Sequence, residues 1–464
     1  MLPTRDDFAA VFRLAVPVVT VQVGLMFMGV VDTLMVGRVS SEALASVALG
    51  NSYVWGVICF MMGILLALDP IISQAVGAGE HESVARGVQR GIILSFLVSI
   101  IAGILMVPVG PVLALLQQPE EVVPAAEVYT HIVIPGVLPF MLFTVWRQTL
   151  QALHRLRPLV AAIILANVFN AVLNRVLIFG GWGVPAMGVA GAAWATTICR
   201  WLMFLLVAGL AWRAMRPYLW PIRREAVQLE LLWRVVRLGL PIGGHMWLEF
   251  AAFAVVLLLM GRLGTSELAA HNIAIHLAAL TFMVPVALGQ SASVLVGNGI
   301  GAGFQQRARR TAMAAIIAVV GFECLTTILF LSSPRLLAEL CTSDVVVISI
   351  AATLIPIAGV FQLFDGLQAV AAGTLRGAGD THAPMYINLV GYWMFGVPVS
   401  VFLAFHLEGG APGLWWGSAA GLCVVATLLL LRVRHRFSRD IERVNVEQHP
   451  PVPIPQPEET HTAA

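Results

Sequence analysis

Three acidic side chains stand inside long apolar stretches of this chain: Asp32, Glu249 and Asp365. A charge within hydrocarbon costs at least ~2.5–3.5 kcal/mol on insertion scales, so each acid needs a chemical reason to be there. Carboxylate oxygens are suitable ligands for hard cations such as Na⁺, and a desolvated carboxylic acid can bind and release a proton. The three acids therefore predict a site for Na⁺ or H⁺ within a membrane.

A histidine accompanies one of these acids. His245 lies four residues before Glu249, so the two side chains share one face of a helix. We expect His245 to be a hydrogen-bond partner of Glu249. A metal-binding pair is the alternative, although no third ligand stands at a suitable spacing.

Other side chains in the same stretches are candidates for supporting roles. Asn170 and Asn174 share a helical face, and they either hydrogen-bond between helices or belong to a second site. Gln368 follows Asp365 closely and is a further polar candidate. Methionine and aromatic side chains form adaptable apolar surfaces, so Met28 and Phe361 are candidates to line a cavity.

A structural role for the acids is the alternative to an ion site. In that case they would pair with buried donors such as Arg147 or Arg175.

The composition indicates whether the chain folds in water or in a lipid bilayer. The chain is 59% hydrophobic and 11% charged, and its mean hydropathy is +0.88. Soluble proteins have roughly 45–50% apolar and about 25% charged residues. The five cysteines are scattered, which indicates neither a disulfide framework nor a zinc site. We expect a membrane protein without a cofactor and without a nucleic-acid partner.

Twelve apolar stretches are long enough to cross the membrane as helices. About 20 apolar residues span the ~30 Å of hydrocarbon in a bilayer. The sequence therefore predicts an all-α integral membrane protein with transmembrane helices at 14–36, 47–68, 91–116, 129–150, 159–179, 188–212, 236–259, 271–295, 312–331, 346–372, 385–405 and 413–431.

The second half of the chain repeats the first. Pro17 recurs as Pro241 and Gly77-Ala78-Gly79 recurs as Gly301-Ala302-Gly303, both at the same separation. Six spans in each half make both copies enter the membrane in the same direction. The sequence thus predicts two six-helix lobes related by a pseudo-two-fold axis along the membrane normal, as in transporters built from parallel repeats.

The domain boundaries follow from this repeat. We predict one lobe at 1–212, a cytoplasmic linker at 213–230, a second lobe at 231–433 and a cytoplasmic, disordered tail at 434–464. The three acids break the symmetry, since their counterparts in the other half are Val256, Leu25 and Thr144. This asymmetry favours a functional role for them.

The distribution of arginines predicts the orientation. If both termini lie on one side, most loop arginines lie there too, and the opposite loops hold only Arg38, Arg262 and Arg335. By the positive-inside rule both termini are cytoplasmic. We expect a multi-pass protein of the bacterial inner membrane, with surrounding lipid as a partner and with one chain as the working unit.

Several segments of the chain form a distinctive set. They are Val31-Asp32-Thr33-Leu34-Met35-Val36-Gly37-Arg38, Gly239-Leu240-Pro241-Ile242-Gly243-Gly244 leading to Glu249, Met260-Gly261-Arg262-Leu263-Gly264 leading to Leu268-Ala269-Ala270-His271, and Phe364-Asp365-Gly366-Leu367-Gln368 leading to Leu375-Arg376-Gly377-Ala378-Gly379-Asp380. Together these segments resemble the multidrug and toxic compound extrusion (MATE) family, in particular its NorM-like branch.

The resemblance carries expectations about fold and function. It implies two lobes around a V-shaped cleft and export of bulky, often cationic compounds in exchange for Na⁺ or H⁺. Glu249 and Asp365 would be the main cation-site residues of the second lobe, and Asp32 the acid of the first. His245 departs from the expected pattern, because a glutamine-like residue is expected there, and this leaves the coupling ion open.

The resulting hypothesis is a secondary multidrug antiporter that takes up sodium, with protons competing, and exports amphiphilic or cationic drugs. A flippase for lipid-linked precursors is the alternative, but the ionisable residues in the spans are mainly acidic and such a protein needs an arginine-rich cleft. An enzyme is disfavoured, because no HExxH, GxSxG or DDxxD motif is present. The chain also lacks the GxxxxGK[ST] loop of an ATP-driven pump.

Overall fold

A computed structural model describes residues 2–444 of the chain. Within this range the regular structure is helical, and its β-structure is a single isolated bridge between Gly181 and Val184. The last part of the predicted tail, 445–464, lies outside the described residues.

The described residues contain twelve candidate membrane spans. This confirms the predicted fold class, and several spans are longer than predicted or consist of two or more helical segments. The helices are α1 Arg5–Val36, α2 Ser41–Leu65, α3 Leu68–Gly77, α4 His81–Met106, α5 Val109–Leu115, α6 Val123–Val133, η1 Ile134–Gly136, α7 Val137–Ala152, α8 Arg157–Phe179, α9 Gly188–Leu210, α10 Trp212–Leu219, η2 Arg224–Val227, α11 Leu229–Leu263, α12 Thr265–Gly301, α13 Gln305–Ser332, α14 Pro334–Glu339, α15 Val345–Gly377, α16 His382–Asn388, η3 Leu389–Gly396, α17 Val397–Val401, η4 Phe402–His406 and α18 Gly410–Ser438.

The start of α1 shows how local sequence sets a helix end. Thr4 accepts a hydrogen bond from the backbone N–H of Asp7, and Asp7 accepts one from the backbone N–H of Thr4, which is a capping box. The helix then continues through Pro17 to Val36. Its 32 residues at ~1.5 Å each exceed the ~30 Å hydrocarbon thickness, so α1 projects beyond the membrane core.

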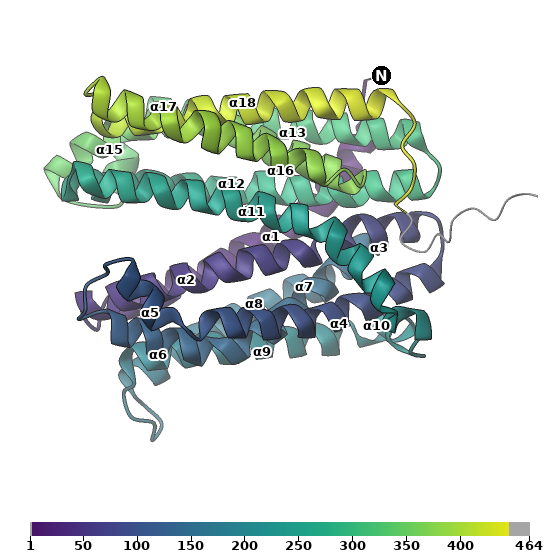
Figure 1. The fold of residues 1–464 in the computed structure, drawn as a ribbon, viewed down its shortest axis with the longest axis horizontal. Helices are drawn as coiled ribbons and strands as arrows, with labels where there is room; N and C mark the ends of the chain where they lie inside the picture. The colour runs from purple at the N-terminus through teal and green to yellow at the C-terminus, as the bar shows by residue number, and fades with distance from the viewer. Residues whose placement is uncertain (1, 445–464) are drawn as a thin grey trace, which may run out of the picture.

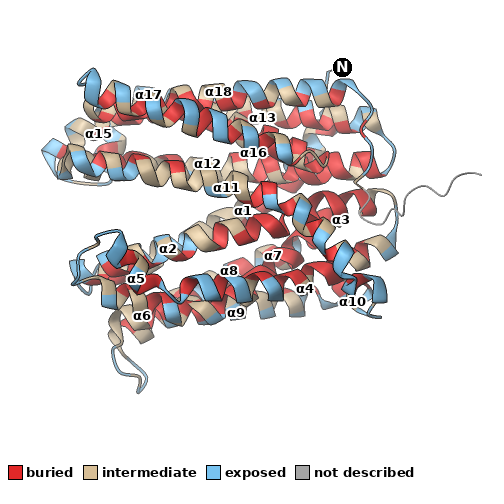
Figure 2. Ribbon diagram, viewed as in Figure 1, coloured by how far each residue is buried: buried red, intermediate tan, exposed pale blue. Residues whose placement is uncertain are grey.

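The chain forms two layers of helices, one from each half of the sequence (Figure 1). Helices α2–α9 make the lower layer in this view, and α12–α18 make the upper one. Buried residues gather inside each layer and where the layers meet (Figure 2). The layers touch through α1 on α12, α2 on α11, and α3 on α12.

The repeated glycines lie at the contact between α3 and α12. A Cβ atom on Gly77 would overlap the backbone of Asn298, and one on Gly301 would overlap the backbone of Gln74. Gln74 and Asn298 are themselves counterparts in the repeat, so the two contacts mirror each other. The repeated motif therefore keeps its glycines because two backbones approach closely there.

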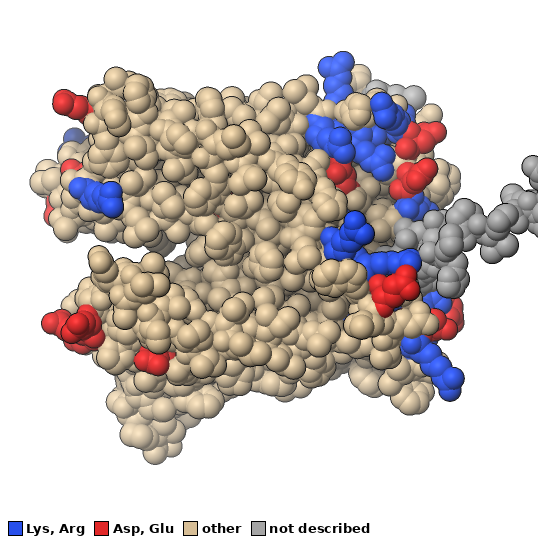
Figure 3. Space-filling model, in the orientation of Figure 1, with Lys and Arg blue, Asp and Glu red and all other residues tan. Residues whose placement is uncertain are grey.

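Arginine side chains gather at one end of the molecule (Figure 3). We call it the basic end; its residues include Arg86, Arg223, Arg309, Arg310 and Arg443. At the opposite end the two layers separate and leave a groove (Figure 3).

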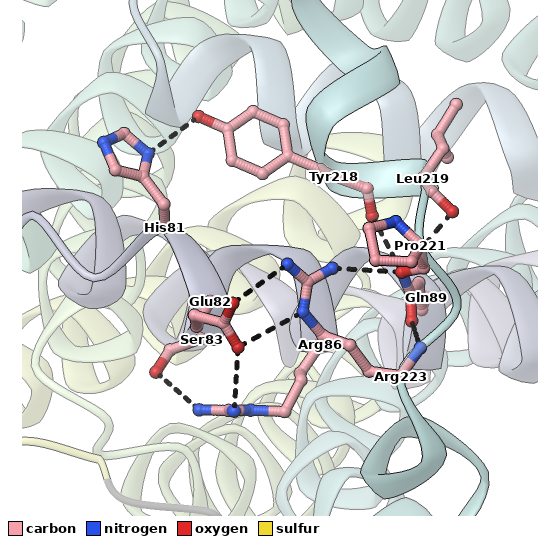
Figure 4. Close-up of polar contacts among 9 residues, drawn as sticks. All are labelled: His81, Glu82, Ser83, Arg86, Gln89, Tyr218, Leu219, Pro221 and Arg223. Carbon is pink, nitrogen blue, oxygen red and sulfur yellow. Dashed lines mark hydrogen bonds and ion pairs between the residues drawn. The ribbon is translucent and has the colours of Figure 1, made fainter.

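The linker between the halves folds onto α4 (Figure 4). The Gln89 side-chain amide donates to the backbone carbonyls of Tyr218 and Pro221, at 3.1 and 2.9 Å. Its carbonyl oxygen accepts from the backbone N–H of Arg223 at 2.9 Å. One buried side chain thus fixes the path of the linker against the first lobe.

The last helix extends beyond 433, the predicted end of the second lobe. Helix α18 continues to Ser438, because Phe437 is still buried against the second lobe. The following segment, residues 439–444, crosses to the first lobe, and we call it the strap. Its Arg443 bonds Glu80 at 2.8 Å, and its Val444 N–H donates to Gln74 Oε1 at 2.7 Å.

Candidate functional site

A cavity of about 640 Å³ lies between the two lobes. Its walls come from α1, α2, α7 and α9 on one side and from α11, α12, α15 and α16 on the other. Much of the surface is methionine and phenylalanine, which suits bulky apolar ligands of varied shape. These residues are Met26, Met28, Met62, Met203, Met246, Met283, Phe140, Phe250, Phe253 and Phe282.

Asp32 is the centre of a polar cluster in the first lobe. Its Oδ1 accepts hydrogen bonds from the side-chain amides of Asn170, at 2.9 Å, and Asn174. Its Oδ2 accepts from the Thr196 hydroxyl at 3.0 Å. Among the described residues, the amide oxygens of both asparagines have no partner. Both asparagines therefore make the predicted hydrogen bonds between helices, and Asp32 accepts them.

The basic neighbour of Asp32 is Arg200 on α9, which lies within coulombic range of it. Arg147 and Arg175 were the predicted structural partners of the acids, and neither is the basic neighbour of Asp32. Arg175 is exposed and stacks on Phe179 at 5.3 Å, and Arg147 donates to Gln22 at 3.1 Å. Arg200 could have been found in the sequence as a charge within the apolar stretch 188–212.

Glu249 is the cavity-facing acid of the second lobe. Its Oε2 accepts from the Gln368 amide at 3.0 Å, and Gln368 Oε1 accepts from the Tyr392 hydroxyl at 3.0 Å. His245 Nε2 lies 3.7 Å from Glu249 Oε2, while His245 Nδ1 donates to the Pro384 carbonyl at 3.4 Å. That bond orients the imidazole so that its other nitrogen faces the carboxylate.

Asp365 lies behind this cavity wall. It is 6% exposed, it is absent from the residues that line the cavity, and its Oδ1 has no partner among the described residues. It lies within coulombic range of Glu249, so the two acids belong to one electrostatic cluster.

Glu323 on α13 is a third acid of this cluster and was missed in the sequence. Its side chain is buried against Gly366, next to Asp365, and its Oε2 accepts from Thr326 at 2.7 Å. Its Oε1 has no partner within residues 2–444. An acid inside the apolar stretch 312–331 was the available signal.

Of the two predicted lining residues, Met28 lines the cavity and Phe361 does not. Phe361 is 2% exposed and packs edge-on against Phe253 and Trp415, at ring separations of 6.0 and 5.5 Å. The prediction for Phe361 was wrong because its helical face turns toward α18 and not toward the other lobe.

The oxygen atoms of these two clusters could bind a monovalent cation, and the carboxylates could bind protons. Within the part of the chain that the structure describes, no group of three or more His, Cys, Asp or Glu side chains has the spacing of a metal site. The Asp32 cluster and the Glu249 cluster offer carboxylate and amide oxygens, which is the donor chemistry of a hard cation.

The cavity lining carries both acidic and basic side chains. The acids are accompanied by three arginines, two of them toward the basic end. The ionisable Asp, Glu and Arg residues of the lining are Asp32, Glu249, Asp380, Arg147, Arg200 and Arg376.

Polar contacts link the two lobes at the basic end. The Asn298 side-chain amide donates to His154 Nε2 at 2.8 Å, so this imidazole is neutral in the contact. Burial and the nearby Arg307 lower the pKa of His154, which favours the neutral form. In the strap contact, the hydrogen bond from Arg443 lowers the pKa of Glu80 and favours its charged form.

Fold and site together define a two-lobed membrane transporter, and the comparisons identify its family. The MatE family model matches residues 17–176 and 241–402, so the chain belongs to the MATE family. It is 36% identical to the "Probable multidrug resistance protein NorM" of Mesorhizobium japonicum, over 92% of this chain and 94% of that protein. It is 34% identical to the "Multidrug resistance protein PmpM" of Pseudomonas aeruginosa, over 96% of each.

Solved structures agree with this assignment. The eukaryotic MATE transporter AtDTX14 superposes with a TM-score of 0.85 and 26% identity, over 92% of this chain and 96% of that one. A multidrug resistance MATE family transporter in an outward-facing conformation shares the fold, with a TM-score of 0.84 and 19% identity over 93% and 96%.

Proposed function

We propose that the chain is a secondary antiporter that exports bulky, often cationic compounds in exchange for Na⁺ or H⁺. The observation that carries this function is the cavity between the lobes, which combines an adaptable apolar lining with Asp32 on one side and Glu249 on the other. Family membership and the multidrug resistance relatives support the same conclusion. Rocking of the lobes would expose the cavity to alternate sides.

The coupling ion that we propose is sodium, with protons competing for the same carboxylates. Glu249 and Asp365 interact as like charges inside the protein, so both cannot stay ionised without a compensating cation. The carboxylate oxygens of Glu249 and Asp365 are the kind of ligand that a hard cation requires. Asp32 would contribute to opening and closing of the first lobe.

The orientation that we propose places the basic end and both termini in the cytoplasm. Arginines concentrate at that end (Figure 3), and cytoplasmic loops of membrane proteins carry an excess of basic residues. The membrane is then the bacterial inner membrane, and the groove at the opposite end faces outward.

Labelling of single cysteines placed at Glu225 and Glu339 with a membrane-impermeant reagent tests this orientation. Only the Glu339→Cys variant should react from outside intact cells.

One chain surrounded by lipid is the proposed working unit, because both polar clusters and the whole cavity lie within a single copy. Large apolar side chains such as Ile104, Leu258 and Leu325 are exposed and would face lipid tails. Light scattering of the detergent-solubilised protein would test the monomer.

Transport by the purified protein in liposomes tests the function itself. A cationic dye should leave the liposome interior when a sodium or proton gradient is imposed in the correct direction, and it should stay when neither gradient is present. Absence of dye movement under either gradient, with correctly folded protein, would reject the antiporter.

A further inference from the structure

Two segments of the chain cross between the lobes at the basic end, and the repeat relates their contacts. The linker leaves the first lobe after its last span, and the strap leaves the second lobe after α18 (Figure 1). His81, at the start of α4, lies 3.3 Å from the Tyr218 hydroxyl of the linker. Gln305 is the counterpart of His81 in the repeat, and it binds the strap. The linker joins the lobes covalently, whereas the strap joins them by contacts that can break.

The first half of the strap is bound to the second lobe. The Gln305 amide donates to the Ile441 carbonyl at 2.8 Å, and its oxygen accepts from the Ile441 N–H at 3.3 Å. The Ile441 side chain is 3% exposed and packs in the core of the second lobe. Arg309 donates to the Arg439 carbonyl at 3.0 Å and contacts Asp440 at 3.4 Å. This half is therefore a fixed base that moves with the second lobe.

The second half of the strap meets the first lobe at one buried glutamine. Gln74, on α3, is 1% exposed, and its oxygen accepts from the Val444 N–H at 2.7 Å. Its amide donates to the Gly377 carbonyl of the second lobe at 3.0 Å. The Val444 side chain packs against the core of the first lobe and lies against Gly379, where a Cβ atom would overlap it. Detachment of the strap would remove the bond from Val444 to this buried oxygen, which is costly.

We propose that the strap is a detachable latch, whose second half fastens the second lobe to the first at the basic end. Val444 must release Gln74 before the lobes separate there, and the base on Gln305 keeps the segment in place to rebind. The ion pair between Arg443 and Glu80 contributes less, because its side chains are 40% and 45% exposed. The inference rests on the proposed alternating access, and it names an element that biases the equilibrium between the two arrangements of the lobes.

Two shortened chains test the latch. One ends at Ser438 and lacks the strap, and its matched control ends at Val444 and keeps the strap. Spin labels at Arg155→Cys and Gln306→Cys, two exposed positions on opposite lobes, report the separation of the lobes at the basic end. The accessible native cysteines are first replaced by serine; they are Cys324, Cys341 and Cys423.

Distances between the labels are measured by pulsed electron paramagnetic resonance on purified protein in lipid nanodiscs, without any gradient. In the chain that ends at Ser438, the ratio of separated to joined molecules should rise about tenfold, as loss of one buried hydrogen bond predicts. The control that ends at Val444 should match the full-length protein.

A point variant keeps the test independent of whether the shortened chain folds. Val444→Pro in the full-length protein removes the N–H that Gln74 accepts, and it should raise the separated population as the deletion does. Val444→Ala keeps this N–H and should shift the distances less.

A reversible cross-link tests whether release is required for transport. A bis-methanethiosulfonate reagent bridges Glu80→Cys and Arg443→Cys across the lobes, or Arg309→Cys and Asp440→Cys within the second lobe as the control. Dye export should fall to near background in the first bridged pair and return with dithiothreitol. The bridged control pair should export normally.

Wild-type distances both in the chain that ends at Ser438 and in Val444→Pro would overturn the latch. Normal export by the bridged pair across the lobes would overturn it as well, since the strap would then not have to detach. Failure of the antiporter is distinguishable from failure of the latch, because the distances are measured without a gradient and need no transport.

Discussion

At the scale of single residues, the two halves of the repeat differ at the positions of the acidic side chains. Leu25 is the counterpart of Glu249, and both line the cavity. The backbone duplication therefore supplies equivalent positions on the two walls, and the side chains make one of them apolar and the other acidic. A cation would interact differently with each wall, as a coupled transporter requires.

Neutralising the acids of the second lobe tests their role most directly. Glu249→Gln and Asp365→Asn each remove a charge with little change of volume, so we expect export of a cationic dye to fall to near background while expression stays close to wild type. Efflux from cells and membrane quantification by immunoblot measure the two effects.

The control for these variants is Glu339→Gln, which removes an exposed acid that pairs with Arg335 at the far end from the strap. It should export normally. Wild-type efflux in both site variants would show that the cluster has no part in transport.

Asp32→Asn addresses the first lobe. The amide cannot accept from Asn170, Asn174 and Thr196 as the carboxylate does with its two oxygens, so we expect slower export. Dye affinity should stay within about twofold, because the apolar lining is unchanged. Turnover per folded molecule and dye binding are measured on the same preparation. A lower melting temperature with normal turnover would instead assign Asp32 to helix packing alone.

At the scale of elements, closure of the basic end depends on helices from both lobes. The contact of α3 with α12 brings backbones together through Gly77 and Gly301, and Arg376 meets Asp69 across the lobes. Gln74 ties this contact to the strap, because its amide donates to the Gly377 carbonyl while its oxygen accepts from Val444. Opening of this end must break all of these contacts together.

The strap should respond to acid but not to pH changes near neutrality. The pKa of Glu80 is lowered from its ordinary 4.5 by its bond to Arg443, so the contact persists above that value and is lost as pH falls through the lowered pKa. Hydrogen exchange at the Val444 amide, corrected for the intrinsic rate, should be equally slow at pH 6 and pH 8 and faster once the pH falls below the lowered pKa of Glu80.

Glu80→Gln is the matched variant for this experiment. It removes the charge of Glu80 at nearly constant size, so exchange at Val444 should be faster already at pH 7. Unchanged protection in this variant would mean that the bond from Val444 to Gln74 holds the strap without help from the ion pair.

At the scale of the whole molecule, the coupling ion decides which gradient moves the lobes. We expect an inward sodium gradient at equal pH, with a protonophore present, to sustain dye export from liposomes, and acid to slow it by competition. The reason is the cluster of Glu249, Asp365 and Glu323, whose negative charges need compensation by Na⁺ or by protons. Export that requires a proton gradient and ignores sodium would replace sodium with protons.

The sequence alone determined the class of fold. Apolar stretches of sufficient length, repeated in two halves with the same number of spans, predict a two-lobed helical membrane protein, since backbone groups in lipid must be bonded within helices. It also singled out Asp32, Glu249 and Asp365, because an acid in an apolar stretch is visible without any structure. Glu323 carried the same signal and was overlooked.

Only the tertiary structure decided which of these side chains meet. Asp32 joins Asn170, Asn174 and Thr196 from two other helices, and Arg147 and Arg376 face one cavity from opposite lobes. Phe361 turned out to lie behind the cavity wall. The physical reason is that spacing along a helix fixes the face on which a residue lies, whereas the packing of the helices fixes what that face meets.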